Sequence, residues 1–309
     1  MLITTDLVGC SKADSEDTSY TEESNASDVL DNDIAELILH ELTRPEYNGR
    51  NTGTEEIRQA SLFLADIYED IGLKMWAGDS FVMTYTNADA IELIDESIKD
   101  DHGHNIVGVI PGRDRTKAVI VTAHYDAKGG GEGALDNASG VATMLHVANG
   151  LLIGGAQPET DVVFCAYDGE ELGLIGSKIF APIAIAHYAE LYNINIDVVG
   201  FAADPLTIDI SQANERNRLL REDFAELLAD AEIPYIDMPL ETGIIAWVSD
   251  HASFDRLGIA NINLGTLSDE IIVTIDSERD VVDLVDIALI EKLADAIKAF
   301  IVINHGKMY

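Results

Sequence analysis

Cysteine, basic side chains and long apolar runs are all scarce in this sequence of 309 residues. Its two cysteines are Cys10 and Cys165, and Cys165 lies in an apolar segment, 162–166, that is typical of a buried strand. A disulfide between the two is therefore not expected. No segment approaches the roughly 20 consecutive apolar residues that span a bilayer, so the sequence predicts no transmembrane helix.

Basic residues are strongly outnumbered, because 19 Lys and Arg stand against 56 Asp and Glu, which gives a formal charge of −37. Such a surface repels phosphate backbones and anionic lipid headgroups, which argues against nucleic acid as a partner. The acidity fits a high-salt environment, an exported protein or an ordinary, strongly solvated surface. It carries no information about catalysis.

Residues 1–32 form a polar, acidic segment that we expect to be disordered or to act as a tether. Within it, Leu7-Val8-Gly9-Cys10 resembles the lipobox of bacterial lipoproteins. A secretory signal also needs a basic start and an apolar stretch, and residues 1–6 supply neither. Either the start is truncated and Cys10 carries a lipid anchor, which predicts an extracellular or cell-envelope protein, or the match is fortuitous and a cytoplasmic location stays open.

Residues 33–309 are predicted to form the folded domain. Apolar residues recur at helical spacing in 33–39 and 54–71, where Thr54 is a candidate cap and the predicted inward residues are Ile57, Ala60, Leu62, Phe63 and Ile67. The predicted strands that follow are 81–85, 105–110, 118–123, 162–167, 194–201 and 259–264, and the predicted helices are 138–152, 172–180, 214–231 and 281–303. This alternation indicates an α/β fold with a mixed, mostly parallel central sheet and helices on both faces.

Polar residues gather where predicted strands end, which is where ligands bind in such sheets. His124 and Asp126 follow the strand 118–123 and point the same way. A carboxylate beside a metal-binding imidazole orients it by holding its other N–H, so His124 is a candidate ligand, and a structural hydrogen-bond pair is the alternative. Asp136 follows the glycine-rich segment 129–133 and is predicted to be either a helix cap or a metal-bridging carboxylate.

The segment Asp168-Gly169-Glu170-Glu171 follows the strand 162–167. Because adjacent side chains point apart, one glutamate can bind a metal while the other accepts a proton from water activated by that metal. Favourable acidic charge at a helix N-terminus is the alternative. Asp197 places a carboxylate in a predicted apolar strand, which is unfavourable unless it is paired or coordinated. The segment Ser249-Asp250-His251 concentrates polar groups before another predicted short helix, and a capped helix start with a solvated His251 is the alternative.

Together these segments resemble the M28 family of zinc peptidases, and the resemblance runs from about Glu36 to Ile303. It implies a three-layer α/β/α fold of the zinc-exopeptidase type and an exopeptidase, foremost an aminopeptidase that releases N-terminal residues from peptides. The matching motifs, in family order, are Gly49-Arg50-Asn51-Thr52-Gly53-Thr54, His124-Tyr125-Asp126, Asp136-Asn137-Ala138-Ser139-Gly140, Asp168-Gly169-Glu170-Glu171, Ile196-Asp197 and Ser249-Asp250-His251.

The resemblance also implies a role for each matching residue. Asp136 is expected to bridge two zinc ions, with His124 and Asp197 completing one site and Glu171 belonging to the other. Glu170 is expected to be the general base that takes a proton from the water held between the ions. Asp126 is expected to hold His124 in place.

One expected ligand is missing, because the family places a histidine in a segment shortly before the last helix where this chain has Asp276. No histidine occurs between His251 and His305 that could replace it by a shift of alignment. His251 is an alternative ligand, although the family's matching residue lines the site without binding metal. We expect Asp276 to coordinate, since carboxylate oxygen binds zinc as closely as imidazole nitrogen does. An all-oxygen site also predicts that Mn²⁺ or Co²⁺ competes with zinc there.

Three other functions stay open at this point. A carboxypeptidase of the same family needs a cationic pocket, which the few arginines near the motifs do not indicate. A glutaminyl cyclase works with a single zinc. A binding protein that has kept the fold and lost catalysis is favoured only by Asp276.

Overall fold

The computed structural model describes residues 33–86, 102–128, 130–155, 157–210, 215–239 and 248–309. The segment 1–32, with its predicted tether and Cys10, lies outside the described residues. Cys165 is a free, buried thiol in a strand, as expected. Among the helices of the described part, none combines the length and the apolar character that crossing a membrane requires.

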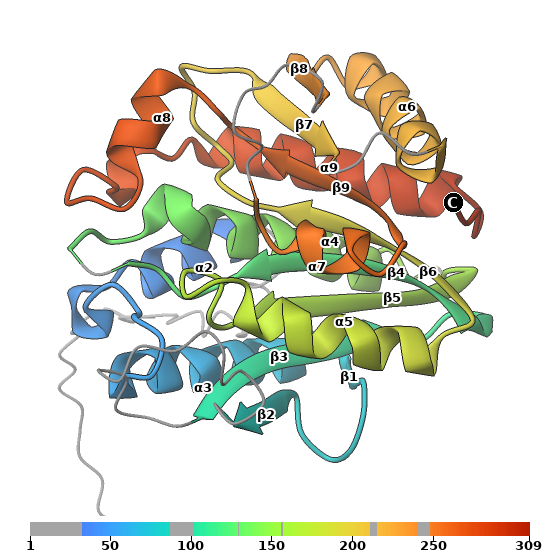
Figure 1. The fold of residues 1–309 in the computed structure, drawn as a ribbon, viewed down its shortest axis with the longest axis horizontal. Helices are drawn as coiled ribbons and strands as arrows, with labels where there is room; N and C mark the ends of the chain where they lie inside the picture. Colours follow the sequence, from blue (N-terminus) through green and yellow to red (C-terminus); the bar gives the residue numbers. More distant parts are fainter. Residues whose placement is uncertain (1–32, 87–101, 129, 156, 211–214, 240–247) are drawn as a thin grey trace, which may run out of the picture.

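A nine-stranded mixed sheet lies at the centre of the molecule (Figure 1). Its middle consists of four neighbouring parallel strands, which are β5 (Thr160–Tyr167), β4 (Asp114–His124), β6 (Glu190–Ile196) and β9 (Ala260–Gly265). Antiparallel pairing adds β3 (His102–Ile110) beside β5 and β7 (Leu206–Ile210) beside β9. The outer strands are β1 (Lys74–Met75), β2 (Val82–Thr86) and β8 (Tyr235–Pro239). The sheet expected from the sequence is therefore confirmed.

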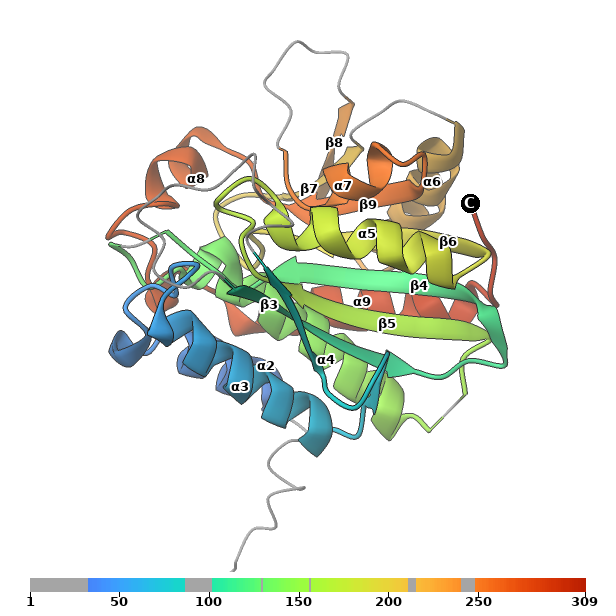
Figure 2. The same ribbon diagram turned by 60° about the horizontal axis from the view of Figure 1, so that its bottom comes forward.

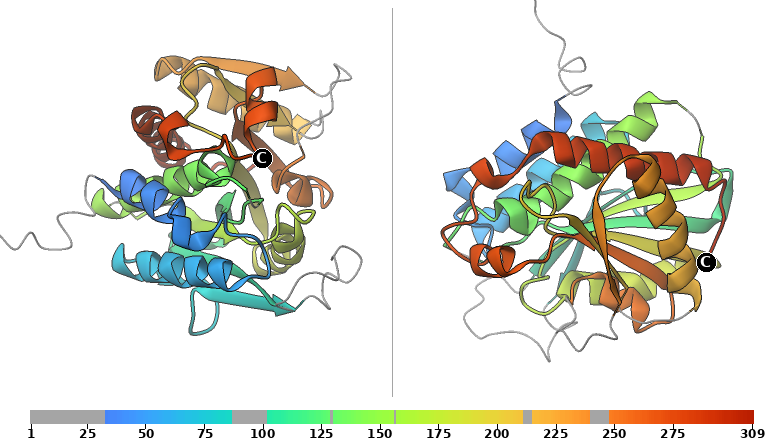
Figure 3. Two further views of the ribbon diagram at one scale, coloured as in Figure 1. Left: turned by 90° about the vertical axis from the view of Figure 1, so that its left-hand side faces the viewer. Right: turned by 90° about the horizontal axis from the view of Figure 1, so that it is seen from above.

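Helices cover both faces of this sheet (Figures 2 and 3). One core joins a face of the sheet to α2 (Ile34–Leu42), α3 (Glu55–Asp70), α4 (Ser139–Ile153), α6 (Glu215–Asp230) and α9 (Ile287–Ile303). A second core joins the other face to α5 (Ile175–His187) and the short α7 (His251–Asp255). The short α8 (Asp269–Thr274) precedes α9. This arrangement confirms the three-layer architecture.

The segments 118–123 of β4 and 162–167 of β5 are almost entirely apolar because both faces of these strands are buried. In β4, Val119 and Val121 pack in the core beneath α4 and α9, whereas Ala118 and Ile120 pack in the core beneath α5. A strand covered on both sides favours such a continuous apolar run, but β6 and β9 depart from it and alternate apolar residues with buried asparagines. The polar residues at the ends of β4 and β5 are therefore conspicuous.

Several predicted boundaries are wrong, each for a local reason. The strand expected over 194–201 ends at Ile196, because Val198 adopts a left-handed conformation (φ 59°), so Asp197 lies just beyond the strand and not within it. The helix expected from residue 172 begins at Ile175, after the left-handed Leu174. The last helix begins at Ile287, where Asp286 caps it. The first two of these shifts place Asp197, Glu170 and Glu171 in loops at the edge of the sheet.

The predicted helix from Thr54 is present, and the Thr54 hydroxyl accepts a hydrogen bond from the main-chain N–H of Ile57. Its phase differs from the prediction at one position, because Leu62 is 47% exposed. The buried face instead includes Leu64 and Tyr68. A period of 3.6 residues places these two, and not Leu62, on the same side as Ile57.

The start of α4 is tied to the end of β6 through one side chain. Asn137 donates from Nδ2 to the carbonyl of Ile196 at 2.9 Å, and its Oδ1 accepts from the N–H groups of Gly140 (2.9 Å) and Val198 (3.2 Å). Asn137 directly follows Asp136, and Ile196 directly precedes Asp197. The two carboxylates are thus held near each other by main-chain contacts.

Replacing Gly140 by alanine tests this close approach. The added Cβ would lie 2.3 Å from Asn137 Oδ1 and 2.5 Å from the Ile196 carbonyl oxygen, so we expect the free energy of unfolding to fall by about 1–3 kcal/mol. Gly150→Ala in the same helix meets only the flexible Lys298 side chain, and we expect it to be neutral or stabilising by up to about 1 kcal/mol. Urea denaturation of both variants measures the difference. Equal effects of the two substitutions would contradict the packing described.

Candidate active site

The carboxyl ends of three neighbouring parallel strands bring the candidate residues together. His124 is the last residue of β4, Glu170 and Glu171 lie in the turn after β5, and Asp197 directly follows β6. Asp136 joins them from the irregular turn 134–138 that leads into α4. These side chains therefore meet at the carboxyl ends of the parallel strands, where the sequence predicted the site.

The first group of ligand atoms consists of His124, Asp136 and Asp197. Nε2 of His124 lies 3.1 Å from Asp136 Oδ1 and 3.2 Å from Asp197 Oδ1, and all three side chains are buried. The ligand atoms of this group lie within 4.8 Å of one another. Nδ1 of His124 lies 3.0 Å from the main-chain carbonyl oxygen of Asp126, to which it can donate its proton. That leaves the Nε2 lone pair directed at the two carboxylates, as a metal ligand requires.

Asp126 contacts more than the histidine that it was expected to hold. Its Oδ1 lies 3.4 Å from His124 Nδ1. The same carboxylate accepts hydrogen bonds from the main-chain N–H groups of Glu170 and Glu171, both at 3.1 Å, and from the Thr52 hydroxyl at 3.0 Å. Asp126 therefore links the orientation of His124 to the backbone of both glutamates.

The second group of ligand atoms consists of Asp136, Glu171 and Asp276, again within 4.8 Å of one another. Asp136 is common to both groups. Glu171 Oε1 is buried and accepts no hydrogen bond from the described residues. Asp276 adopts a left-handed conformation (φ 58°) in the loop after α8, and its side chain is 39% exposed. An unsatisfied buried carboxylate oxygen beside two further carboxylates fits a divalent cation.

Lys128, which the sequence did not single out, reaches this second group. Its Nζ lies 2.6 Å from Asp276 Oδ2 and 2.9 Å from Glu171 Oε2. Burial lowers the pKa of Lys128, but the two carboxylates outweigh burial and raise it overall. Its position two residues after Asp126 is the signal in the sequence that could have identified it.

Glu170 is partly buried and lies beside the two groups, but it belongs to neither. The helix α5 begins only at Ile175, so the favourable charge at a helix N-terminus, which was the alternative, does not explain the pair of glutamates. Burial raises the pKa of Glu170 well above its usual value, and although His124 lowers it, Asp250 and Asp197 raise it further. Glu170 is thus a carboxyl group with a high proton affinity next to candidate metal ligands.

Several carboxyl groups at the site share this raised proton affinity. Burial raises the pKa of Asp136 to about 6, of Asp250 to about 7 and of Glu171 to about 8, and neighbouring carboxylates add to the effect in each case. Ionised carboxylates in such surroundings are unfavourable unless a cation neutralises them. The composition and burial of the donor set therefore fit divalent metal ions.

A solvated His251 was the alternative interpretation, and it is wrong, because the side chain is fully buried at the start of α7. Burial lowers its pKa to about 4, although Asp197 opposes this, so the ring is neutral near pH 7. His251 belongs to neither group of ligand atoms among the described residues. The geometry favours Asp276 over His251 as the residue that takes the place of the missing histidine.

A pair of buried charges, Arg50 and Asp280, supports the loop that carries Asp136. Arg50 is fully buried and donates to the carbonyls of Tyr125 (2.7 Å), Glu132 (2.9 Å), Gly133 (2.9 Å) and Leu42. Asp280 accepts from the main-chain N–H groups of Leu135 (2.6 Å) and Asp136 (3.0 Å). Arg50 lies in the motif 49–54 that the sequence revealed, and Asp280 lies four residues after Asp276, but the roles of both depend on contacts across the fold.

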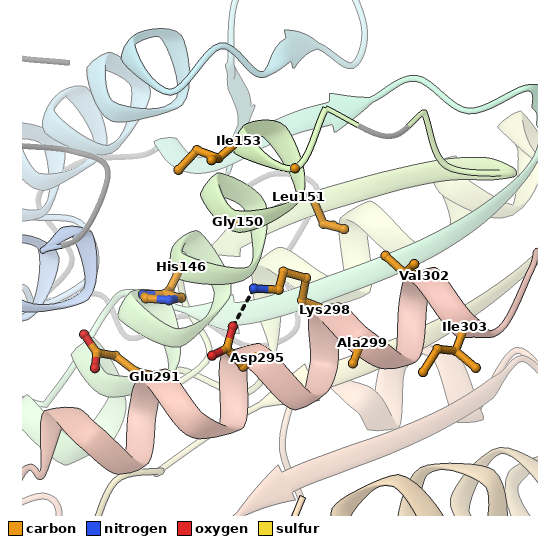
Figure 4. Close-up of a pocket in the computed structure, with 11 residues that line it drawn as sticks. His146, Gly150, Leu151, Ile153, Glu291, Asp295, Lys298, Ala299, Val302 and Ile303 are labelled. Carbon is orange, nitrogen blue, oxygen red and sulfur yellow. Dashed lines mark hydrogen bonds and ion pairs between the residues drawn. The ribbon is translucent and has the colours of Figure 1, made fainter. Parts of the chain in front are cut away.

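A hollow of about 890 Å³ lies elsewhere, between α4 and α9 (Figure 4). It is lined by His146, Leu151, Ile153, Lys298, Ile303 and their neighbours, and Lys298 pairs with Asp295 there. None of the candidate ligands borders it. The buried ionisable groups of the candidate site lie instead at the carboxyl edge of the sheet, away from this hollow.

The chain is similar to known peptidases along much of its length. A model described as peptidase family M28 matches residues 105–301, which is more than half of the chain. Aminopeptidase YwaD of Bacillus subtilis (strain 168) is 26% identical over 202 residues, which cover 62% of this chain and 41% of YwaD. The chain spans less than half the length of the curated relatives that it matches.

Solved structures share the fold at low sequence identity. BSAP, a zinc aminopeptidase from Bacillus subtilis, superposes with a TM-score of 0.66 at 16% identity over 88% of this chain and 94% of that one. The glutaminyl cyclase of Bacteroides thetaiotaomicron superposes with a TM-score of 0.69 at 20% identity over 89% of this chain and 98% of that one. Because both activities occur on this fold, the fold alone does not decide between them.

Asp280→Asn tests whether this carboxylate positions Asp136. An amide can accept only one of the two hydrogen bonds now made to Leu135 and Asp136, so we expect zinc affinity to fall by on the order of 10- to 100-fold. Competition with a chromophoric chelator measures that affinity, and circular dichroism checks the fold. Asp283→Asn, an exposed position three residues along, is the matched control and should bind zinc like the parent. Unchanged affinity in Asp280→Asn would show that its contacts do not position the ligand.

Proposed function

Because the chain belongs to peptidase family M28, we propose that it is a metal-dependent exopeptidase, and specifically an aminopeptidase that releases N-terminal residues from peptides. The observation that carries this proposal is the pair of ligand groups that share Asp136, with the partly buried Glu170 beside both and part of neither. A shared carboxylate supports two metal ions side by side. A separate carboxyl group of high proton affinity supports general base catalysis.

We propose that zinc is the metal and that two ions bind. His124, Asp136 and Asp197 would hold one ion, and Asp136, Glu171 and Asp276 would hold the other. Bound zinc would acidify water and polarise the carbonyl of the scissile peptide bond. Asp126 keeps Nδ1 of His124 directed away from the metal position and fixes the backbone of the two glutamates.

In the proposed reaction, Glu170 accepts a proton from the water that attacks the scissile carbonyl and then gives it to the amine that leaves. Its raised pKa serves the first of these steps, because a high proton affinity makes the carboxylate a better base. The carboxylates that surround Glu170 keep bound cations close and disfavour anionic groups of a substrate. A peptide with a free, positively charged N-terminus fits this environment.

A carboxypeptidase would need a free cationic group for the substrate's terminal carboxylate. Lys128 already pairs with Glu171 and Asp276. Arg50 is fully buried and donates to main-chain carbonyls. Arg50 is thus committed to the main chain, and Lys128 is committed to the two carboxylates unless a metal displaces it, which supports the aminopeptidase over the carboxypeptidase.

Glu170→Gln tests the proposed base. We expect the turnover number to fall by roughly 10²- to 10⁴-fold, because glutamine cannot accept the proton, while both metals stay bound. Steady-state kinetics with an aminoacyl substrate and metal analysis of the same preparation measure the two quantities. Glu159→Gln, which is exposed and pairs with Arg113, is the control and should retain full activity. A fully active Glu170→Gln enzyme would refute the role.

Peptides that differ in their terminal groups distinguish the aminopeptidase from the alternative functions. We expect cleavage of peptides with a free N-terminus and none after N-acetylation, because acetylation removes the charge that the carboxylates attract. Cleavage of N-acetylated peptides from the C-terminus would indicate a carboxypeptidase instead. Ammonia release from peptides that begin with glutamine would indicate a glutaminyl cyclase, and inactivity on all three substrates with both metals bound would indicate a binding protein.

Asp276→His tests the consequence of the all-oxygen group. We propose that Mn²⁺ or Co²⁺ competes with zinc where Asp136, Glu171 and Asp276 meet, because oxygen ligands suit manganese especially. After equilibration with equal concentrations of the three metals, the variant should contain a higher proportion of zinc than the parent. Identical metal content and activity in the two proteins would contradict the proposal.

A further inference from the structure

Lys128 places a positive charge inside the second group of ligands. The residue follows β4, its side chain is 49% exposed, and its ammonium lies between Asp276 Oδ2 at 2.6 Å and Glu171 Oε2 at 2.9 Å. Two of the three carboxylates of the group Asp136, Glu171 and Asp276 are therefore already neutralised in part by the chain itself. In the first group, His124 contributes a neutral ligand to the same two-carboxylate arrangement.

The two groups of ligands differ by one unit of formal negative charge, and Lys128 offsets this difference. His124, Asp136 and Asp197 carry a formal charge of −2 with a neutral imidazole, whereas Asp136, Glu171 and Asp276 carry −3. Adding the ammonium of Lys128 brings the second group to −2, which equals the first. A histidine at position 276 would bring the same result without a lysine. Lys128 thus compensates for the extra charge of Asp276.

We propose that Lys128 is an internal competitor for the second metal position, so that this position binds its ion more weakly than the first one does. The inference rests on the proposed function, which assigns a metal to each group. An incoming divalent ion must displace the ammonium from Asp276 and Glu171. The ammonium can yield, because lysine has a flexible four-carbon stem and its half-exposed end can turn into water.

This competition makes the occupancy of the second position depend on the supply of free metal. An ion pair between groups as exposed as Lys128 and Asp276 is weak, so the ammonium does not block a metal that is abundant. When metal is scarce, Lys128 keeps Asp276 and Glu171 paired.

Zinc titration of the metal-free protein tests the inference. Wild type, Lys128→Met and Lys117→Met are each titrated calorimetrically in the presence of a competing chelator. We expect two classes of site in wild type and a second class that is on the order of tenfold tighter in Lys128→Met, the size of effect that groups around metal ligands exert. The affinity of the first class of site, which already binds zinc more tightly in wild type, should be unchanged in Lys128→Met.

Lys117→Met is the matched control. It removes the same charge from the other end of β4, where Lys117 pairs with Glu190 at 2.9 Å. We expect both classes of site to be unaffected there. In the background of Asp276→His, adding Lys128→Met should have a smaller effect than in wild type, because the extra carboxylate that Lys128 offsets is gone.

Each outcome decides between distinct explanations. A second class of site that is unchanged or weaker in Lys128→Met overturns the competition and leaves the proposed function intact, provided that two zinc ions bind. Absence of zinc binding in all variants overturns the competition together with the metal centre of the proposed function. Equal tightening in Lys117→Met would show a general effect of charge and would also overturn the specific role of Lys128.

Discussion

Buried carboxylates that crowd together at one edge of the sheet are the constraint on which the rest of the site depends. Folding raises the pKa of Asp136 to about 6 and of Glu171 to about 8, above the values near 4 that such groups have in an unfolded chain. Because the folded values are the higher ones, ionisation of these groups opposes folding as the pH rises from about 4 to about 8. Cations that bind the ionised groups remove this penalty, so the site and its metals stabilise each other.

The surrounding fold holds these carboxylates in place largely through main-chain groups. Asp126 and Asp280 accept hydrogen bonds from the N–H groups of the residues that they position, and Arg50 donates to carbonyls of the neighbouring loops. Asn137 ties the turn of Asp136 to the end of β6. Because the chain belongs to peptidase family M28, we interpret these contacts as the support of a catalytic site. Asp276, with its partner Lys128, distinguishes the second group of ligand atoms, where we propose that a metal binds.

Much of this could be predicted from the sequence, and the failures have physical causes. The apolar strands, the caps and the polar residues at strand ends are local signals, so the sheet and the positions of His124, Asp136 and Glu170 followed from them. The contacts of Lys128 with Asp276 and of Asp280 with Asp136 join segments that are far apart along the chain. The position of Lys128 near Asp126 hints at the site, but no local pattern shows which residue either side chain contacts. The end of β6 before Asp197 depends on the left-handed Val198, which no propensity of valine predicts.

The account is tested most directly by locating metals in the protein. Crystals equilibrated with excess zinc and measured at wavelengths on both sides of the zinc absorption edge give an anomalous map of each ion. The account predicts two peaks at about 2 Å from their ligand atoms, one beside His124, Asp136 and Asp197 and one beside Asp136, Glu171 and Asp276. Absence of a peak at the first position, or a pair of peaks that do not share Asp136, would contradict it.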